Sequence, residues 1–321
     1  MELDTLDKSI LMELQYRFPR DPYPYETVAE RLGIREEELL DRLRRLKSIG
    51  ILKRVGFYVN YRSVGLKAAL IAYKAPGLHE RLAKIYRVDR YATHVYLRDH
   101  PEYNVWVVTK RRSMEELIGH VEHVKKELGV EAIILYSKRT YKLSVKYDLE
   151  RGISWAGPYS TVSPDPPRPE DLGIPAEVLR MFRSLPIERS PYSRIAEALG
   201  VGVDEAAETA WNLLEKGLLG DPGAALDGRR VGFNENAMVV MEPSGCEESL
   251  CQCATQLPFT THVVLRRSIP EGAWRHTCYF MVHAVSREMI KELVGEAVEK
   301  CSPRSFHVIR SLADLKPGVM R

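Results

Sequence analysis

The stretch Tyr25-Glu-Thr-Val-Ala-Glu-Arg-Leu-Gly33-Ile recurs later in the chain as Tyr192-Ser-Arg-Ile-Ala-Glu-Ala-Leu-Gly200-Val, 167 residues further on. The same offset carries Leu46–Leu52 onto Leu213–Leu219 and Val64-Gly65 onto Val231-Gly232. An offset of 168 carries Thr93–Arg98 onto Thr261–Arg266. Because so many matches share nearly one offset, the sequence predicts two copies of one architecture.

Composition is that of a globular chain without a membrane segment. The 321 residues include 47 Lys and Arg against 44 Asp and Glu, a formal net charge of +3. No apolar run approaches the ~20 residues that a membrane span needs, and the acidic start Met1-Glu2-Leu3-Asp4 lacks the layout of a secretory signal. We therefore expect a cytoplasmic protein with no membrane partner. The charge is uneven, with +7 over residues 1–169 and −4 over residues 170–321.

Each half begins with a helix-turn-helix pattern. In the first half, apolar residues from Leu6 to Phe18 recur at helical spacing, and further helices are predicted over Tyr25–Leu32 and Arg35–Ile49. The following Lys53-Arg54-Val55-Gly56-Phe57 is typical of the start of a wing. In the second half, Gly220-Asp-Pro-Gly-Ala-Ala stands at that place, and we expect it to replace the wing.

The rest of each half alternates strands and helices in the order β-α-β-β-α-β, which is the ferredoxin-like unit. The predicted elements of the first half are Leu66–Tyr73, Leu78–Val88, Thr93–Arg98, Tyr103–Val108, Met114–Leu128 and Ala132–Val145. Those of the second half are Ala237–Met241, Glu248–Leu257, Thr261–Arg267, Thr277–Ala284, Arg287–Val298 and Phe306–Ser311.

The predicted fold class is α+β, with two tandem repeats that each join a winged helix-turn-helix to a ferredoxin-like domain; this arrangement resembles that of the Lrp/AsnC-type proteins. Prolines between residues 155 and 169 favour a stiff, extended connection between the repeats. The expected divisions are a helix-turn-helix over 1–60, a ferredoxin-like domain over 61–150, a Pro-rich linker over 151–170, a degenerate helix-turn-helix over 171–230, and a second ferredoxin-like domain over 231–321.

Two longer segments point to a narrower family. Thr93-His94-Val-Tyr96-Leu-Arg98-Asp-His100-Pro-Glu-Tyr103-Asn104-Val-Trp106 resembles a segment of one subunit of the siroheme decarboxylases, which are Lrp/AsnC-like proteins. Gly232–Val240, together with the region from His262 to Ala284, resembles the partner subunit. The chain is thus similar to both subunit types fused in order. It departs from the family at Val264, where a Tyr is usual, and at Arg275-His276-Thr277, where Pro-Tyr-Asn is more common.

The resemblance implies a non-redox carboxy-lyase. Such an enzyme removes carboxyl from two acetate arms of siroheme to give 12,18-didecarboxysiroheme, in an alternative haem or haem d1 route. Its substrate is an anionic iron tetrapyrrole, so it needs cationic side chains for carboxylates, aromatic walls, and a proton donor. No cofactor is implied, because the iron belongs to the substrate.

The candidate catalytic residues are His94 and His100; either could be the proton donor, and one of them could instead be an iron ligand. His94, Tyr96 and Arg98 alternate along one predicted strand and so share a face. The candidate substrate-binding residues are Arg54, Tyr96, Arg98, Tyr103, Asn104, Trp106, His262, Arg266, Arg267, Trp274 and His276. We expect no metal site beyond ligation of the substrate iron by His94 or His262. Alternative interpretations are surface ion pairs for the arginines and core packing for Trp106 and Trp274.

The cysteines invite a metal-site interpretation that their spacing does not favour. Cys246, Cys251 and Cys253 match neither paired zinc spacing nor a ferredoxin run. The odd total of five also argues against the disulfide framework of a secreted protein. We expect buried, unlinked cysteines that pack as small hydrophobic residues.

The rival function is that of an Lrp/AsnC-type DNA-binding transcriptional regulator. DNA binding needs net positive recognition helices. The first candidate helix mixes arginines with Glu36, Glu37, Glu38 and Asp41, and the second, over Val203–Lys216, is acidic. We therefore expect no DNA partner. A tetrapyrrole sensor without turnover is a third interpretation, and a homodimer of the fused chain is a further expectation.

Overall fold

The computed structural model describes residues 3–317 and divides into two compact units, each of which draws on both halves of the sequence. The helical unit contains residues up to 64, 142–234 and 284–286. The barrel unit contains residues 65–141, 235–283 and those from 287 onward. The division of the sequence into five consecutive segments remains a prediction, because the compact units are assembled from separated stretches.

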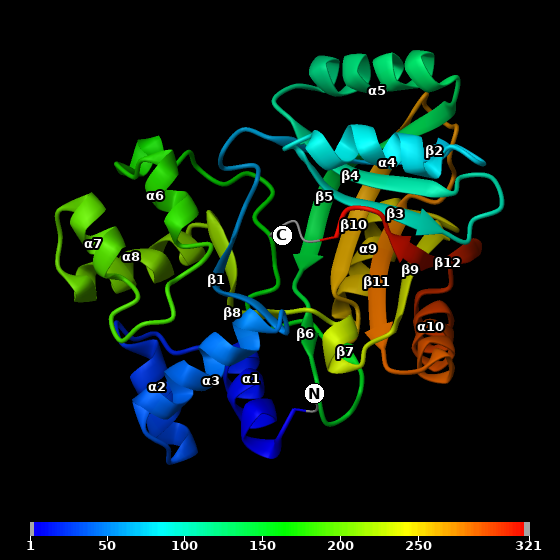
Figure 1. Ribbon diagram of the computed structural model, residues 1–321. Coiled ribbons are helices and arrows are strands. Elements are labelled where there is room, and N and C mark those ends of the chain that lie inside the picture. The colour runs from blue at the N-terminus through cyan, green and yellow to red at the C-terminus, as the bar shows by residue number, and fades with distance from the viewer. Residues whose placement is uncertain (1–2, 318–321) are drawn as a thin grey trace. The chain divides into compact units, whose positions relative to one another are not determined.

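The helical unit is built from two sets of three helices, each followed by a strand (Figure 1). The first set is α1 (Thr5–Tyr16), α2 (Pro24–Leu32), α3 (Glu36–Ser48) and β1 (Leu52–Val59). The second is α6 (Ala176–Met181), α7 (Ser193–Leu199), α8 (Val203–Glu215) and β8 (Leu219–Leu226). Gly33 and Gly200 end α2 and α7 in the left-handed conformation, with φ of 66° and 68°. One apolar core, which includes Leu11, Phe57 and Trp211, joins both sets.

The expectation that Gly220–Ala225 replaces a wing is wrong. These residues belong to β8, which pairs antiparallel with β1, so that Arg54 lies opposite Ala225 and Tyr58 opposite Gly220. Glycine permits the pairing: a Cβ on Gly223, where φ is 117°, would lie 2.0 Å from the carbonyl oxygen of Leu14. The Pro-rich stretch also packs within the helical unit, because the amide of Leu143 donates to the carbonyl of Ser160 at 2.8 Å.

The barrel unit contains every helix and strand that the sequence predicted for the two ferredoxin-like regions. Those of the first region are β2 (Lys67–Lys74), α4 (His79–Val88), β3 (Ala92–Arg98), β4 (Val105–Arg111), α5 (Met114–Leu128) and β5 (Glu131–Leu143). Those of the second are β9 (Glu235–Glu242), α9 (Glu247–Gln256), β10 (His262–Ile269), β11 (Cys278–Ala284), α10 (Arg287–Cys301) and β12 (Ser305–Asp314).

These strands form one closed barrel in the order β10-β11-β9-β12-β3-β4-β2-β5 (Figure 1). The edge strands of the first region, β3 and β5, are therefore neighbours of β12 and β10 from the second. Side chains alternate between two faces of each strand. Ile71 and Tyr73 of β2 pack with helix residues such as Leu82 and Leu117, whereas Leu70 and Ala72 pack in a cluster with Met238 and Ile309. Because that second cluster contains residues of both regions, we place it inside the barrel.

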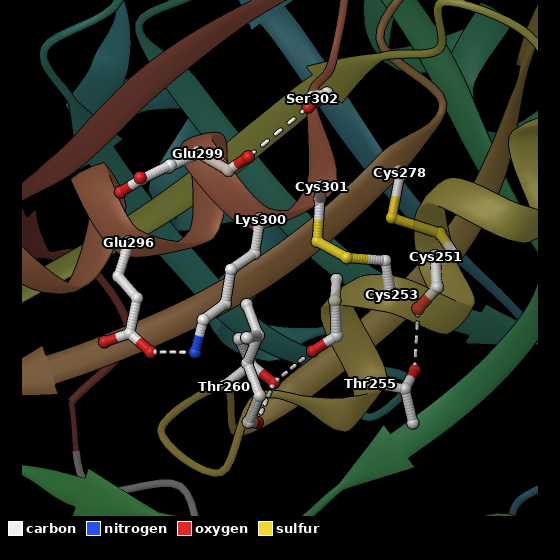
Figure 2. The surroundings of a disulfide bond; sticks show 12 residues. Cys251, Cys253, Thr255, Thr260, Cys278, Glu296, Glu299, Lys300, Cys301 and Ser302 are labelled. Carbon is white, nitrogen blue, oxygen red and sulfur yellow. Dashed lines mark hydrogen bonds and ion pairs between the residues drawn. A yellow bond between two sulfur atoms is a disulfide. The ribbon is translucent and has the colours of Figure 1, made fainter.

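Two disulfides hold α9 in the barrel unit, contrary to the expectation of unlinked cysteines (Figure 2). Cys251 is bonded to Cys278 of β11, and Cys253 to Cys301 at the end of α10, with Cα–Cα distances of 5.5 and 5.6 Å. Cysteine spacing does not predict these two bonds, because the pairing depends on how helices and strands meet in the fold. Cys246 is exposed, with a free thiol. Over residues 3–317 no set of three or more potential ligand side chains has a metal-binding arrangement, and no described helix is long and apolar enough to cross a membrane.

Candidate active site

His94, Tyr96 and Arg98 lie along β3 with their side chains on one face, as their alternation predicted. The rings of His94 and Tyr96 are 5.7 Å apart between centroids, and the guanidinium carbon of Arg98 lies 5.0 Å from the Tyr96 ring centroid. The three side chains thus form a continuous polar and aromatic row.

Arg98 is a buried cation that has no anionic partner among the residues that the structure describes. Its exposed fraction is 5%, and its Nη1 donates to the carbonyl of Ile309 in β12 at 3.1 Å. Within residues 3–317, no carboxylate forms an ion pair with it and its Nε has no hydrogen-bond acceptor, while the adjacent Asp99 pairs with Arg310 at 2.7 Å. Burial lowers the Arg98 pKa to about 10. A buried guanidinium is costly unless an anion reaches it.

The second row lies on β10, where His262 and Arg266 share a face. Nη1 of Arg266 donates to the carbonyl of Leu135 at 3.1 Å and to Oγ of Ser137 at 2.9 Å, and its guanidinium lies 5.4 Å from the Tyr279 ring centroid. Burial, and then the charge of Arg266, lower the His262 pKa to about 4.

A threonine precedes each of the histidines His94 and His262 and contacts its Nδ1. The distances to Oγ of Thr93 and Thr261 are 2.9 and 3.2 Å. Each threonine hydroxyl also donates across the sheet to a carbonyl, that of Val108 at 3.4 Å or Met281 at 3.2 Å. Each hydroxyl then accepts from Nδ1–H, so the lone pair of the neutral imidazole lies on Nε2. This is the tautomer of many metal-ligating histidines.

His100 has the opposite tautomer. Its Nδ1 accepts hydrogen bonds from the backbone amides of Glu102 and Tyr103, at 3.2 and 3.0 Å. The proton of the neutral imidazole is therefore on Nε2, which leaves no lone pair there for an iron ion. Proton donation requires the imidazolium form, in which Nδ1 is protonated as well and no longer accepts from these amides. Burial, and then His307, lower the His100 pKa.

Aromatic rings surround His100. Its ring centroid lies 5.5 Å from that of Trp274 and 5.7 Å from that of Tyr103. Trp106 is fully buried, lies 5.8 Å from Trp274, and donates from Nε1 to the carbonyl of Tyr103 at 2.6 Å. His276 lies 5.7 Å from Trp274 and 4.6 Å from His307. We call these rings the aromatic cluster: His100, Tyr103, Trp106, Trp274, His276 and His307.

Family models match both regions of the barrel unit and the first helices of the chain. A family described as "AsnC-like ligand binding domain" matches residues 63–142 and 230–316, and one described as "Siroheme decarboxylase NirDL-like HTH domain" matches residues 7–52. The siroheme decarboxylase alpha subunit of Oleidesulfovibrio alaskensis is 33% identical over 46% of this chain and 91% of its own length. The chain belongs to the siroheme decarboxylase family.

Two further members of the family match nearly the whole chain. The siroheme decarboxylase NirDL subunit of Paracoccus pantotrophus is 26% identical over 92% of this chain and 90% of its own length. The crystal structure of the siroheme decarboxylase NirDL has a TM-score of 0.64 at 21% identity, over 96% of this chain and 91% of that one. A second crystal structure of NirDL, in complex with an iron-uroporphyrin III analogue, has a TM-score of 0.63 at 21% identity and covers 98% of this chain and 92% of that one. Both structures share the fold.

Two of the predicted site residues of this siroheme decarboxylase family member, Arg267 and Asn104, do not join the two rows or the aromatic cluster, and a third, Arg54, belongs to the helical unit. Arg267 follows Arg266 and so faces the other way, where its Nη2 pairs with Glu247 of α9 at 2.5 Å. The side chain of Asn104 bonds to the backbone of Ala75, accepting at 2.8 Å and donating at 3.2 Å, which is a structural role. Arg54 lies in β1 of the helical unit, where Nη1 donates to the carbonyls of Phe57 and Arg183.

Sequence reasoning missed residues that the barrel brings to the site. In the strand pairs, Trp106 lies opposite Tyr96, and Tyr279 lies opposite Val264. Tyr279 is therefore the counterpart of Trp106, at an offset of 173 instead of 168. A careful account of this five-residue insertion could have found Tyr279. His283 lies in the segment that resembles the partner subunit but was not singled out, and His307, which carries no local motif, needed the structure.

Proposed function

We propose that the chain is a siroheme decarboxylase that removes carboxyl from two acetate arms of siroheme without redox chemistry, for a haem or haem d1 route. The observation that carries this proposal is Arg98, a buried guanidinium inside the barrel that lacks an anionic partner among the described residues. A substrate carboxylate supplies the missing charge. Arg266 and the aromatic cluster add a second cation and apolar walls for a tetrapyrrole.

The two histidine tautomers divide the chemistry. We assign His100, in its imidazolium form, as a proton donor through Nε2–H, and His94 or His262 as a ligand of the substrate iron through Nε2. Decarboxylation breaks one C–C bond, and the protein replaces the lost carboxyl with a proton at carbon. The pyrrole takes up the electron density in between, so no further cofactor is required.

The arrangement of the chain as two fused repeats also belongs to this proposal. We interpret the chain as a fused pair of related repeats, because one domain family matches it in two places and β-α-β-β-α-β elements occur twice. The two regions join within the barrel unit, where β3 of the first region pairs antiparallel with β12 of the second. Further homodimerisation and a cytoplasmic location remain predictions.

DNA binding is less well supported, although the first helices match a helix-turn-helix family. The arginines of α3 are held in ion pairs within the helical unit: Arg42 with Asp4 and Asp7, at 2.7 and 3.0 Å, and Arg44 with Asp41 at 2.9 Å. Arg45 also pairs with Asp7. These arginines are paired with carboxylates of the protein itself, whereas a recognition helix needs its cationic side chains for DNA phosphates.

The test is anaerobic incubation of the purified protein with siroheme, followed by mass spectrometry. We expect loss of two carboxyl groups per substrate. A haem-like spectrum without product would support a sensor instead, and salt-sensitive, sequence-selective gel shifts without turnover would support a regulator.

A further inference from the structure

A hydrogen-bonded chain of three side chains runs into the aromatic cluster from the second region of the barrel unit. Oγ of Ser305, at the start of β12, donates to Oε2 of Glu242 at 2.7 Å. Nε2 of His276 lies 3.1 Å from the same Oγ. Glu242 ends β9, and His276 precedes β11, so three separate elements meet at this point.

The direction of these bonds determines the tautomer of His276. The hydroxyl of Ser305 has one proton, and the bond to the carboxylate uses it. Ser305 therefore accepts from Nε2–H of His276, which leaves Nδ1 to receive or give the mobile proton. A carboxylate at the end of such a chain stabilises the imidazolium form, as the carboxylate does in carboxylate–histidine pairs.

His276 lies beside the proposed proton donor, His100, but has different hydrogen-bond partners. Both His276 and His100 contact Trp274, with ring centroids 5.7 and 5.5 Å away. His307 lies beside both rings, at 4.6 Å from His276 and 6.2 Å from His100. The imidazole of His100 accepts from backbone amides, whereas that of His276 is hydrogen-bonded through Ser305 to the carboxylate of Glu242.

The proposed reaction requires two protons. Each acetate arm loses CO2 by cleavage of one C–C bond, the electron pair remains on the tetrapyrrole side, and one proton joins the arm to complete a methyl group. Neither step oxidises or reduces the substrate. Since one histidine delivers one proton before it must be recharged, a second donor in the same cluster would allow each arm its own acid.

We propose that His276 is the second proton donor, which serves the second of the two decarboxylations, and that Ser305 and Glu242 are its positioning residues. This inference rests on the proposed siroheme decarboxylase function and deepens it. The carboxylates of the substrate favour the imidazolium form of a nearby histidine, so binding itself charges the donor.

The test uses the full chain with siroheme under anaerobic conditions and separates the product with one carboxyl lost from the product with two. We expect His276→Gln to accumulate the first product, with the second step slowed about 10²–10⁴-fold. Ser305→Ala should slow the second step about tenfold, and Ser305→Thr, which keeps the hydroxyl, should restore it. The matched control is His123→Gln on the exposed face of α5.

A pH profile distinguishes proton donation from a structural effect. The charged and titratable groups around His276 are Glu242, Arg275, Arg304, His100 and His307. Burial, and then His307, lower the His276 pKa to about 4, and Glu242 opposes them by raising it. Glu242→Gln removes that contribution, so the pH limb of the second step should move to lower pH while that of the first step stays.

The outcomes separate this inference from the proposed function. No product from the unaltered protein would overturn both. Full double decarboxylation by His276→Gln at the original rate, or equal slowing of both steps, would overturn the role of His276 alone. If His276→Gln does not fold, the second-step rate of Ser305→Ala decides, and an unchanged rate overturns the proposal.

Discussion

The guanidinium of Arg98 donates to the backbone carbonyl of Ile309 over 3.1 Å, although the two residues are 211 positions apart in the chain. One lies on β3 and the other on β12, which are paired in the barrel. The most buried cation of the candidate site is thus positioned by a strand from the other region. The site requires both regions of the barrel unit, and neither alone would complete it.

Arg98 should bind substrate at a cost to stability. Arg98→Met removes the guanidinium at similar volume, and we expect siroheme affinity to fall about 10–100-fold, as for loss of a charge-assisted hydrogen bond of about 1.5–3 kcal/mol. The free energy of unfolding of the substrate-free protein should stay the same or rise, because a desolvated charge is removed. Spectroscopic titration and urea unfolding measure the two quantities. Unchanged affinity with reduced stability would make Arg98 structural, and Arg310→Met at an exposed ion pair is the control.

His100 should act on the rate and not on binding. In His100→Gln we expect kcat to fall about 10²–10⁴-fold, as for loss of a general acid, with substrate affinity changed only a few-fold. Single-turnover measurements under anaerobic conditions separate the two. A variant that loses the iron spectrum of bound siroheme but keeps its rate would instead identify His100 as a ligand. His123→Gln, whose side chain is 75% exposed, should behave like the unaltered protein.

The alternation of strand residues predicted part of this site. It placed His94, Tyr96 and Arg98 on one face, and the structure confirms that arrangement. The same rule places Arg266 and Arg267 on opposite faces of their strand, although both were predicted to bind substrate. Local rules of this kind work because adjacent side chains on a strand must point in opposite directions.

The other site residues are brought together by pairing between strands that are distant in the sequence, which local sequence rules do not predict. The relay of Glu242, Ser305 and His276 exists only because β9 and β12 are neighbours and His276, just before β11, reaches Ser305. The strand β8 was missed because Gly and Pro disfavour strands in general. Here glycine is tolerated because Gly223 lies too close to Leu14 for any side chain.

The buried histidines should make the protein sensitive to mild acid. Burial, and then His262 and Arg98, lower the His283 pKa to about 3. An unfolded imidazole binds its proton below about pH 6.5, so between pH 6.5 and 3 the unfolded state binds more protons. The free energy of unfolding is therefore greatest above pH 6.5 and falls with decreasing pH, by at most about 1.4 kcal/mol per pH unit for this residue.

His283→Gln should reduce that dependence. Urea unfolding at pH 7, 6 and 5 measures the slope, and we expect the variant to lose less stability than the unaltered protein over this range. Equal slopes would show that His283 is already protonated or already exposed in the folded state.

The two disulfides should stabilise the second region of the barrel unit by restricting the unfolded chain. They close loops with sequence separations of 27 and 48 residues, for which chain entropy gives about 3–4 kcal/mol each. Cys253→Ser removes the link between α9 and α10, and Cys251→Ser removes the link to β11. We expect each to lower the denaturant midpoint under oxidising conditions, and the difference from the unaltered protein to vanish once a reductant is added. Cys246→Ser changes an exposed free thiol and should leave the midpoint unchanged.

The two disulfides should differ in their effect on substrate binding. Because β11 also carries Tyr279 and His283, the Cys251→Ser variant should lose siroheme affinity as well. The Cys253→Ser variant, which loses only the bond between two helices, should keep it. Equal affinity in both variants would show that the disulfide to β11 stabilises the fold without shaping the site.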